Sequence, residues 1–529
     1  MTTDAPPRRA APKPAARKPP AARAPAPAPD PEAASRRIAV IDVGSNSVRL
    51  VVFEALSRSP AYFFNEKVLA GLGAELAETG RLAPEGRRRA LAALRRFAGL
   101  VRRMRIDAVS AIATAAVREA EDGAAFVAEV KRETGLALSV ASGEDEARLA
   151  AQGVLMGWPD AHGLVADLGG ASLELVRVDA GRVGRGLTLP LGPLRLGRLG
   201  LSPAKTDAAI DAALADAGAA LGPQGGRLYL VGGAWRALAK IHMNRTRYPI
   251  QVLHEFELPA DEMLVLARSV AETTPEALSE QVASSRDRLA VTPLGARVLS
   301  RLIRAARPAS VAVSAFGLRE GVLYEHLPPA MRAQDPLLSA ARMMERRNAR
   351  FPGFGAELAA WVRPLLPEAA PAPIPGRARL AEAACLLNDL AWDAHPDYRD
   401  HAIFETVYRA NLSGVGHAER AWLGAALRFR YKAGRAKRAD LPALALLSDE
   451  ERAQARLLGR AIRLGAMISG SAPGVLPLAR LDRTPHHLSL TLDPRIADLA
   501  GEAVEKRLAA LGESLGCAPD LRIAEPQTA

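Results

Sequence analysis

Two short stretches of the chain decide its fold: DLGGASLEL, residues 167–175, and DVGSNSVRL, residues 42–50. When their first aspartates are superposed, Gly, Ser and Leu coincide at offsets +2, +5 and +8. Offset +7 differs, because it holds Arg49 in the first copy and Glu174 in the second. Each stretch joins two β-rich runs through a turn of glycine and small polar residues, which is typical of a hairpin. The repetition, 125 residues apart, predicts a duplicated architecture whose two copies carry different charges.

The chain as a whole has the composition of a globular protein with several domains. Its 529 residues exceed what one hydrophobic core supports, and its 49% hydrophobic and 24% charged residues are close to average. We find neither an apolar run of about 20 residues nor the apolar region of a signal peptide, so we expect a cytoplasmic protein with no membrane partner. Cys385 and Cys517 are too few for a disulfide framework or a zinc site, and we expect them to be packing residues.

The formal charge of +12 favours an anionic partner, although it fits a solubilising surface excess equally well. Part of it lies in residues 1–37, a Pro/Ala/Arg-rich segment with eight Lys/Arg and three acidic residues. This tail has almost no large apolar side chains, which predicts disorder. The alternative is a basic arm that gathers a polyanion.

The order of elements predicts an α/β fold with two related lobes, at residues 38–165 and 166–328. Strand patterns and helix patterns alternate in both halves, for example the helical spacing of apolar residues over 83–105. Residues 336–529 are rich in Ala, Leu and Arg at helical spacing, with few strand signals apart from HHLSLTLD. We therefore expect a separate, mainly helical domain there.

The tips of the two hairpins are the strongest candidates for substrate contact. Glycine and small polar residues expose consecutive backbone N–H groups, a geometry that binds phosphate oxygens. A single Gly-Ser-Asn turn is an ordinary connector, but two such tips on facing lobes would make a phosphate clamp. The predicted substrate-binding residues at the tips are Ser45, Asn46, Gly169, Gly170, Ala171 and Ser172.

Five motifs together resemble one known family. They are DVGSNSVRL, ATAAVREA, SGEDEARLAAQGV, DLGGASLEL and VSAFGLREGVLYE, in this order and spacing. They resemble the exopolyphosphatase and guanosine pentaphosphate phosphohydrolase (Ppx/GppA) family, within the actin, Hsp70 and sugar-kinase superfamily. The resemblance covers residues 38 to about 328 and implies two actin-like, ribonuclease H-like lobes. More loosely, it implies an HD-like helical domain at the C-terminus.

The resemblance also implies roles for individual residues. Glu146 would be the catalytic base that activates water, with Glu174 as the second catalytic carboxylate, which helps to hold the water or the metal. Asp167 and Asp42 would be ligands of Mg²⁺, a hard cation suited to carboxylate oxygens. Arg118 would grip the phosphate.

Three further charged residues lie in or beside these motifs. Arg49 would either add positive charge near the phosphates or stabilise its lobe by an ion pair. Glu144 and Asp145 are surface acids beside Glu146.

The second hairpin departs from the family pattern at two positions. Ala171 and Leu173 stand where the family usually has a glycine and a threonine. Binding by backbone N–H groups survives this change, whereas a hydroxyl is lost. The segment VGGAWRALAKIH, around Gly232 and Gly233, resembles the superfamily's nucleotide-contact loop. Here it would either contact a nucleotide or pack the lobe, since a polyphosphate has no base to recognise.

The C-terminal domain has an Asn388-Asp389 pair where an HD-type phosphohydrolase would have His-Asp. His395, His401 and His417 lack a spacing that we can assign to a metal, so we interpret the domain as catalytically silent. Residues 428–438, with six cationic side chains, would be either a polyanion track or a solvated charge run.

These observations lead to one main hypothesis: a Mg²⁺-dependent exopolyphosphatase that releases orthophosphate from the ends of inorganic polyphosphate. Hydrolysis of pppGpp uses the same chemistry, and a non-catalytic polyphosphate or alarmone-binding protein is the third possibility, which the retained acids disfavour. An aromatic content of 4% disfavours a nucleic-acid partner, and sugar kinase activity rests on analogy of fold alone. We expect a homodimer, although the sequence does not fix the oligomeric state.

Overall fold

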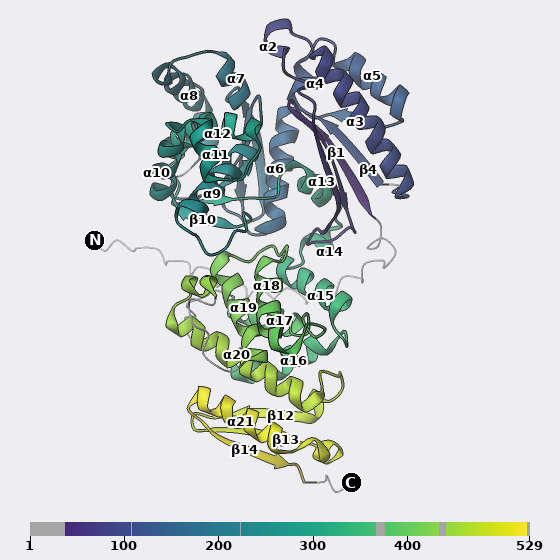
Figure 1. Ribbon diagram of the computed structural model, residues 1–529, viewed down its shortest axis with the longest axis vertical. Coiled ribbons are helices and arrows are strands. Elements are labelled where there is room, and N and C mark those ends of the chain that lie inside the picture. The colour runs from purple at the N-terminus through teal and green to yellow at the C-terminus, as the bar shows by residue number, and fades with distance from the viewer. Residues whose placement is uncertain (1–36, 107, 223, 367–375, 433–440, 526–529) are drawn as a thin grey trace, which may run out of the picture.

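The computed structural model describes residues 37–106, 108–222, 224–366, 376–432 and 441–525. Two lobes lie side by side at one end of the molecule, a helical domain follows, and a small sheet forms the far end (Figure 1). The tail predicted to be disordered lies outside the described residues, apart from Arg37. Within the described residues, no helix combines the length and apolarity that crossing a membrane requires.

The first lobe contains a five-stranded sheet in the order β3-β2-β1-β4-β5. Strand β1 is buried on both faces, and it pairs antiparallel with β2 and parallel with β4. The helix predicted over 83–105 is α3, whose apolar stripe packs against the sheet. The elements are β1 (Ile38–Val43), β2 (Ser47–Phe53), β3 (Tyr62–Leu69), α2 (Leu76–Thr79), α3 (Pro84–Arg103), β4 (Ala108–Ala113), α4 (Ala115–Glu119), α5 (Gly123–Thr134) and β5 (Leu138–Val140).

The second lobe repeats this topology. Its six-stranded sheet has the order β10-β11-β9-β6-β7-β8, and β6 pairs antiparallel with β7 and parallel with β9, as β1 does with β2 and β4. The predicted duplicated α/β fold is therefore confirmed. The strands are β6 (Gly163–Leu168), β7 (Leu173–Asp179), β8 (Arg182–Leu189), β9 (Arg227–Gly232), β10 (Phe256–Pro259) and β11 (Ser310–Val313). The helices are α7 (Pro193–Arg198), α8 (Pro203–Ala217), α9 (Gly233–Arg245), α10 (Ala260–Ala271), α11 (Pro275–Gln281) and α12 (Arg286–Ala306).

Two helices, α6 (Gly143–Gly157) and α13 (Leu318–His326), pack against each other between the lobes. Helix α6 contacts strands β6, β7 and β8 of the second sheet, whereas α13 contacts β1 of the first. The expected division between residues 165 and 166 falls inside β6. Helix α13, at the end of the expected second lobe, contacts strand β1 of the first lobe. A side chain at Gly153 or Gly321 would overlap backbone of the partner segment, so glycine permits this close approach.

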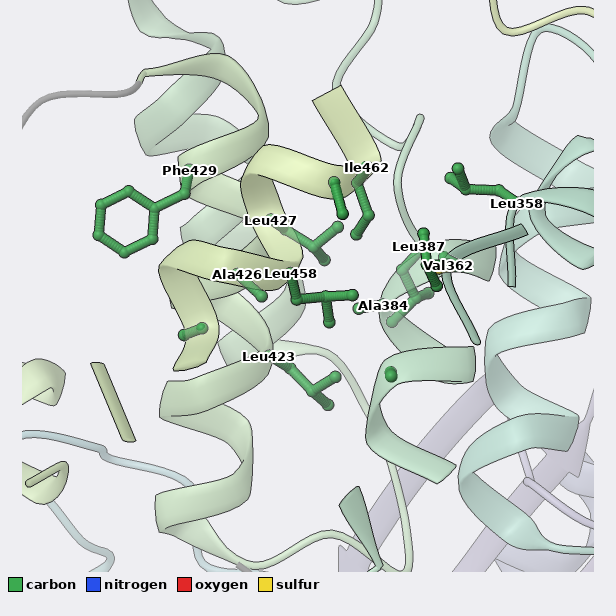
Figure 2. Packing of buried hydrophobic residues seen from close by; sticks show 14 of the residues in the cluster. Leu358, Val362, Ala384, Leu387, Leu423, Ala426, Leu427, Phe429, Leu458 and Ile462 are labelled. Carbon is green, nitrogen blue, oxygen red and sulfur yellow. The ribbon is translucent and has the colours of Figure 1, made fainter. Parts of the chain in front are cut away.

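The C-terminal part begins with a helical domain around a large apolar core, part of which Figure 2 shows. Its helices are α14 (Pro329–Arg332), α15 (Pro336–Asn348), α16 (Phe354–Val362), α17 (Arg377–Leu386), α18 (Arg399–Arg409), α19 (His417–Tyr431) and α20 (Asp449–Ser469). Cys385 and Cys517 are buried and free, as packing residues should be.

A small sheet with one helix closes the chain. The strand predicted from HHLSLTLD is β13 (His487–Leu492), but it lies between two further strands, β12 (Ala479–Arg483) and β14 (Ala518–Ile523). These two were missed because each is short, polar and largely exposed. Helix α21 (Glu502–Leu515) packs on this sheet.

Candidate active site

The two hairpin tips face each other across the cleft between the lobes. The β-carbon that a side chain at Gly170 would have lies 3.9 Å from the Cβ of Ser45, so the tips adjoin. They enclose a cavity of about 210 Å³. The predicted site residues that line it are Asp42, Ser45, Asn46, Glu146, Asp167, Gly169, Gly170, Ala171, Ser172 and Glu174.

Each tip is closed by the same hydrogen bond. The N–H of Gly44 donates to the carbonyl oxygen of Ser47 at 3.0 Å, and the N–H of Gly169 donates to that of Ser172 at 3.0 Å. The two copies therefore share backbone geometry, and the sequence repeat reflects a repeated structure.

In each tip, one carbonyl oxygen accepts a hydrogen bond from a backbone N–H of the segment that follows the hairpin. In the first tip, the Ser45 oxygen accepts from Gly73 N at 2.9 Å; in the second, the Gly170 oxygen accepts from Leu194 N at 2.9 Å. In a planar trans peptide unit, the C=O of one residue and the N–H of the next residue point in opposite directions, so fixing the carbonyl group also fixes the direction of that N–H. The N–H groups of Asn46 and Ala171 are the ones aimed in this way, and neither has an acceptor among the described residues. Both tips thus present free N–H groups that can bind phosphate oxygens.

Three carboxylates, Glu146, Asp167 and Glu174, form the acidic pole of the cleft. Glu146 lies in the first turn of α6, which begins at Ser142 with a capping box made with Asp145. Asp145 is therefore used to start the helix, and among the three acids of GEDE only Glu146 lines the cavity.

Burial and mutual repulsion shift the pKa values of this pole upward. Burial is the main cause that raises the pKa of Glu146 to about 7, against the lowering effect of Arg118, and it raises the pKa of Asp167 to about 6. Burial, with the charges of Glu146 and Asp167, raises the pKa of Glu174 well above its usual range. The pole therefore holds more negative charge than the protein around it compensates, which favours a bound cation or proton.

The residue types of this pole fit Mg²⁺. Within the described residues, no three His, Cys, Asp or Glu side chains are arranged to hold a metal. Mg²⁺, however, keeps most of its waters and needs only one or two carboxylates. The buried Oε1 of Glu174 has no hydrogen-bond partner among the described residues, so it can accept a hydrogen bond from such a water. Asp42 is less available, because its Oδ2 pairs with Arg319 Nη1 at 3.0 Å.

A group of cations forms the basic pole beside Asp42. Burial, and then the charge of Arg319, lowers the pKa of Arg236 to about 10. Burial, followed by several arginines, also lowers the pKa of Lys67. Glu320 and Asp42 lie among these cations and offset part of their mutual repulsion, and a bound anion would offset more of it. The pole consists of Arg49, Lys67, Arg236, Arg288 and Arg319, which come from both lobes.

Sequence reasoning missed Arg236 and Arg319, although both line the cavity. Arg319 stands in the VSAFGLREGVLYE motif without an assigned role, and Arg236 follows the VGG turn, which was expected either to contact a nucleotide or to pack the lobe. Gly232 also lines the cavity, and its φ of 123° places it in a conformation that favours glycine.

Arg118 does not line the cavity, in contrast to the role implied by the resemblance. Its Nη1 contacts Glu146 Oε1 and donates to the Ala141 oxygen at 2.7 Å. The geometry therefore makes Arg118 a positioning residue for Glu146, and its contact with phosphate stays a prediction.

The charge difference at offset +7 has a structural explanation. Asp42 lies opposite Arg49 across the first hairpin, and Asp167 lies opposite Glu174 across the second. The same backbone position thus places a cation beside one aspartate and an acid beside the other. Arg49 makes no ion pair with the described residues; its Nε donates to Asn65 Oδ1 at 2.8 Å.

The C-terminal predictions have mixed outcomes. Arg428 and Arg430 are buried and pair with Asp400 and Asp389, so neither belongs to an exposed polyanion track. Residues 433–438 of that run lie outside the described residues. Asp389 also pairs with Arg350, so guanidinium groups surround the carboxylate that would bind a metal in an HD site.

The histidines of this domain are separated. His395 and His401 are exposed, whereas His417 is buried between Tyr248 and His254.

A duplicated α/β fold with two facing hairpin tips, an acidic pole and a basic pole places this protein in the class of two-lobed, actin-like folds. Comparison with family models narrows this class. Residues 51–330 match the Ppx/GppA phosphatase family, and residues 337–521 match the family described as exopolyphosphatase, C-terminal. The first match covers more than half of the chain, so this chain belongs to the Ppx/GppA phosphatase family.

Individual relatives agree with this assignment. The chain is 33% identical over 165 residues to exopolyphosphatase 1 of Mycobacterium tuberculosis and 32% identical to that of Mycobacterium leprae. These matches cover 31% of this chain and 48% and 49% of the relatives, so the chain spans about half the length of the curated relatives it matches. The crystal structure of an exopolyphosphatase from Cytophaga hutchinsonii shares the fold, with a TM-score of 0.51 and 23% identity over 55% of this chain and 99% of that one.

Proposed function

We propose that this protein is a Mg²⁺-dependent exopolyphosphatase that removes orthophosphate from the end of a polyphosphate chain. The observation that carries the proposal is the basic pole next to the two phosphate-binding tips. A single phosphate would need only the tips, whereas five cations from both lobes suit a substrate with further anionic groups. The names of the mycobacterial relatives, exopolyphosphatase 1, agree with this substrate.

The proposed mechanism is an in-line attack of water on the terminal phosphorus. The N–H groups of the two tips hold the oxygens of the terminal phosphate, while Glu146 accepts a proton from the attacking water. A new bond forms between the water oxygen and phosphorus as the phosphoanhydride bond breaks. Arg236 and Arg319 then lie where they would stabilise the negative charge of the leaving chain.

The remaining polar groups support this step. Glu174 accepts a hydrogen bond from the attacking water, and Arg118 orients Glu146. Bound Mg²⁺ would compensate charge on the phosphoryl oxygens, with Asp167 and Glu174 as the residues that would hold it. A pKa of about 7 for Glu146 suits a base that works near neutral pH.

Polyphosphate suits the cleft better than pppGpp does. Among the described residues that line the cavity, none is aromatic, so only guanidinium groups could stack on a guanine base there. Both substrates would undergo the same cleavage, and only the groups beyond the third phosphate differ.

The experiment that tests this function is phosphate release from long-chain polyphosphate and from pppGpp, each with and without Mg²⁺. We expect Mg²⁺-dependent release from polyphosphate with a higher kcat/KM than from pppGpp. A higher kcat/KM for pppGpp would reverse the substrate assignment. Binding without any release would favour a non-catalytic binding protein.

A further inference from the structure

A second cavity, of about 320 Å³, is lined by residues of the helical domain and of the C-terminal helix α21. Helix α21 lies at the end of the molecule opposite the two lobes (Figure 1). We call this second cavity the junction cavity. Helices α16, α17, α19, α20 and α21 contribute to its wall, as does the short helical turn Arg363–Leu365. It lies within the size range of small-molecule sites.

The wall of the junction cavity is mainly apolar. Val362 and Leu458 belong both to this wall and to the core shown in Figure 2. The other apolar wall residues are Leu365, Leu366, Leu457, Ala461 and Leu515. Such a wall would bind the hydrocarbon part of a ligand, whereas a polyphosphate would lose its hydration there without compensation.

Two hydrogen-bond donors in this wall have no acceptor. Trp422 is 2% exposed, and its Nε1 makes no hydrogen bond with the described residues. The buried Nη2 of Arg377 likewise has no partner among them. Leaving a buried donor unpaired costs free energy, so each unpaired donor needs an explanation.

Three other tryptophans show what is normal in this protein. The indole N–H of Trp235 donates to the Gly295 oxygen at 2.8 Å, and that of Trp361 donates to the Ala479 oxygen at 2.6 Å. Trp392 donates to the Asn348 oxygen at 2.8 Å. Unlike these three, Trp422 leaves its indole N–H without an acceptor among the described residues, and Trp422 lines the junction cavity.

The chemistry of these donors identifies the class of ligand. A guanidinium and an indole N–H together suit an anionic acceptor with two oxygens, and Arg483 adds a second cation to the wall. The acid in the wall, Glu450, is exposed and accepts from Gln454 Nε2 at 2.9 Å. Its charge raises the pKa of Arg377, but burial lowers that pKa by more, so Glu450 offsets only part of the cost of burying this guanidinium. We propose that the junction cavity binds a small apolar carboxylate, with its carboxylate at Arg377 and Trp422 and its hydrocarbon part against the leucines.

The experiment uses the full chain, with decanoate as probe and decan-1-ol as the uncharged control. Isothermal titration calorimetry should show one decanoate per chain and at least tenfold weaker binding of decan-1-ol, because a hydrogen bond to a charged group is lost. Arg377→Met should weaken decanoate binding about tenfold or more and leave the binding of decan-1-ol unchanged. Arg363→Met, an exposed arginine in the same region that does not line the cavity, should have no effect on either.

A spectroscopic measurement keeps the proposal testable if a variant folds poorly. In ¹⁵N-labelled protein, decanoate should move the indole N–H resonance of Trp422, assigned through Trp422→Phe, and leave that of Trp235 in place. Absence of decanoate binding at millimolar concentration would overturn the proposal. Equal binding to the wild type and Arg377→Met, or an unmoved Trp422 resonance, would also overturn it.

Discussion

The two hairpin tips have the same backbone and opposite electrostatics. Both are closed by the same hydrogen bond between offsets +2 and +5, and both leave a backbone N–H without an acceptor among the described residues. Their side chains differ at offset +7, where Arg49 stands opposite Asp42 and Glu174 stands opposite Asp167. The comparison teaches that duplication supplied the backbone geometry of the tip twice, whereas the side chain at offset +7 places a cation on the basic pole in one copy and an acid on the acidic pole in the other.

The largest expected effect comes from removing the base at the acidic pole. Glu146→Gln should lower kcat for polyphosphate about 10²- to 10⁴-fold, the usual contribution of a general base, and leave polyphosphate binding nearly unchanged. Steady-state kinetics together with a direct binding assay would measure both quantities. The matched control is Glu144→Gln, since Glu144 lies two residues away on the same helix but outside the cavity. An unchanged kcat for Glu146→Gln would contradict its role.

A smaller effect is expected at the basic pole. Arg236→Met should raise KM for long-chain polyphosphate about 10- to 100-fold, because a charge-assisted contact with the substrate is lost. It should also make KM less sensitive to salt, since one attractive charge is gone. Arg245→Met, on the same helix α9 but outside the cavity, is the control. If KM rises equally in both variants, the basic pole does not bind the substrate.

The smallest effect concerns Arg118 and appears in the pH dependence. Only deprotonated Glu146 can accept a proton, so the rate should rise with pH through the pKa of this group, about 7. Arg118 lowers that pKa, so Arg118→Met should move the rise to higher pH by about one unit. A pH–rate profile of kcat/KM measures the shift. A raised KM with an unmoved profile would instead favour direct contact of Arg118 with phosphate.

The sequence predicted the hairpins and their tips because both depend on local pattern. Alternating apolar runs fix the strands, and glycines with small polar residues at fixed offsets fix the turns, so the tip residues could be named before their contacts were known. The roles assigned to Glu146 and Asp167 came from motif resemblance, and they stay predictions.

The remaining site residues depend on packing between distant segments. Arg236 and Arg319 reach the cavity from α9 and α13. No local sequence pattern predicts that these two helices meet at the same cleft. The burial of Arg428 and Arg430 was missed for the same reason. Their acidic partners lie 28 and 41 residues earlier in the chain, so a run of cations looked like an exposed surface.

The most direct test of the divided cleft is to neutralise offset +7 in each copy and compare the two variants. Steady-state kinetics on long-chain polyphosphate should show that Glu174→Gln lowers kcat about 10-fold or more with little change in KM, since it acts on the water and metal side. Arg49→Gln should instead raise KM with little change in kcat. If both variants change the same kinetic parameter, the acidic pole and the basic pole do not have separate functions, and the proposed division is wrong.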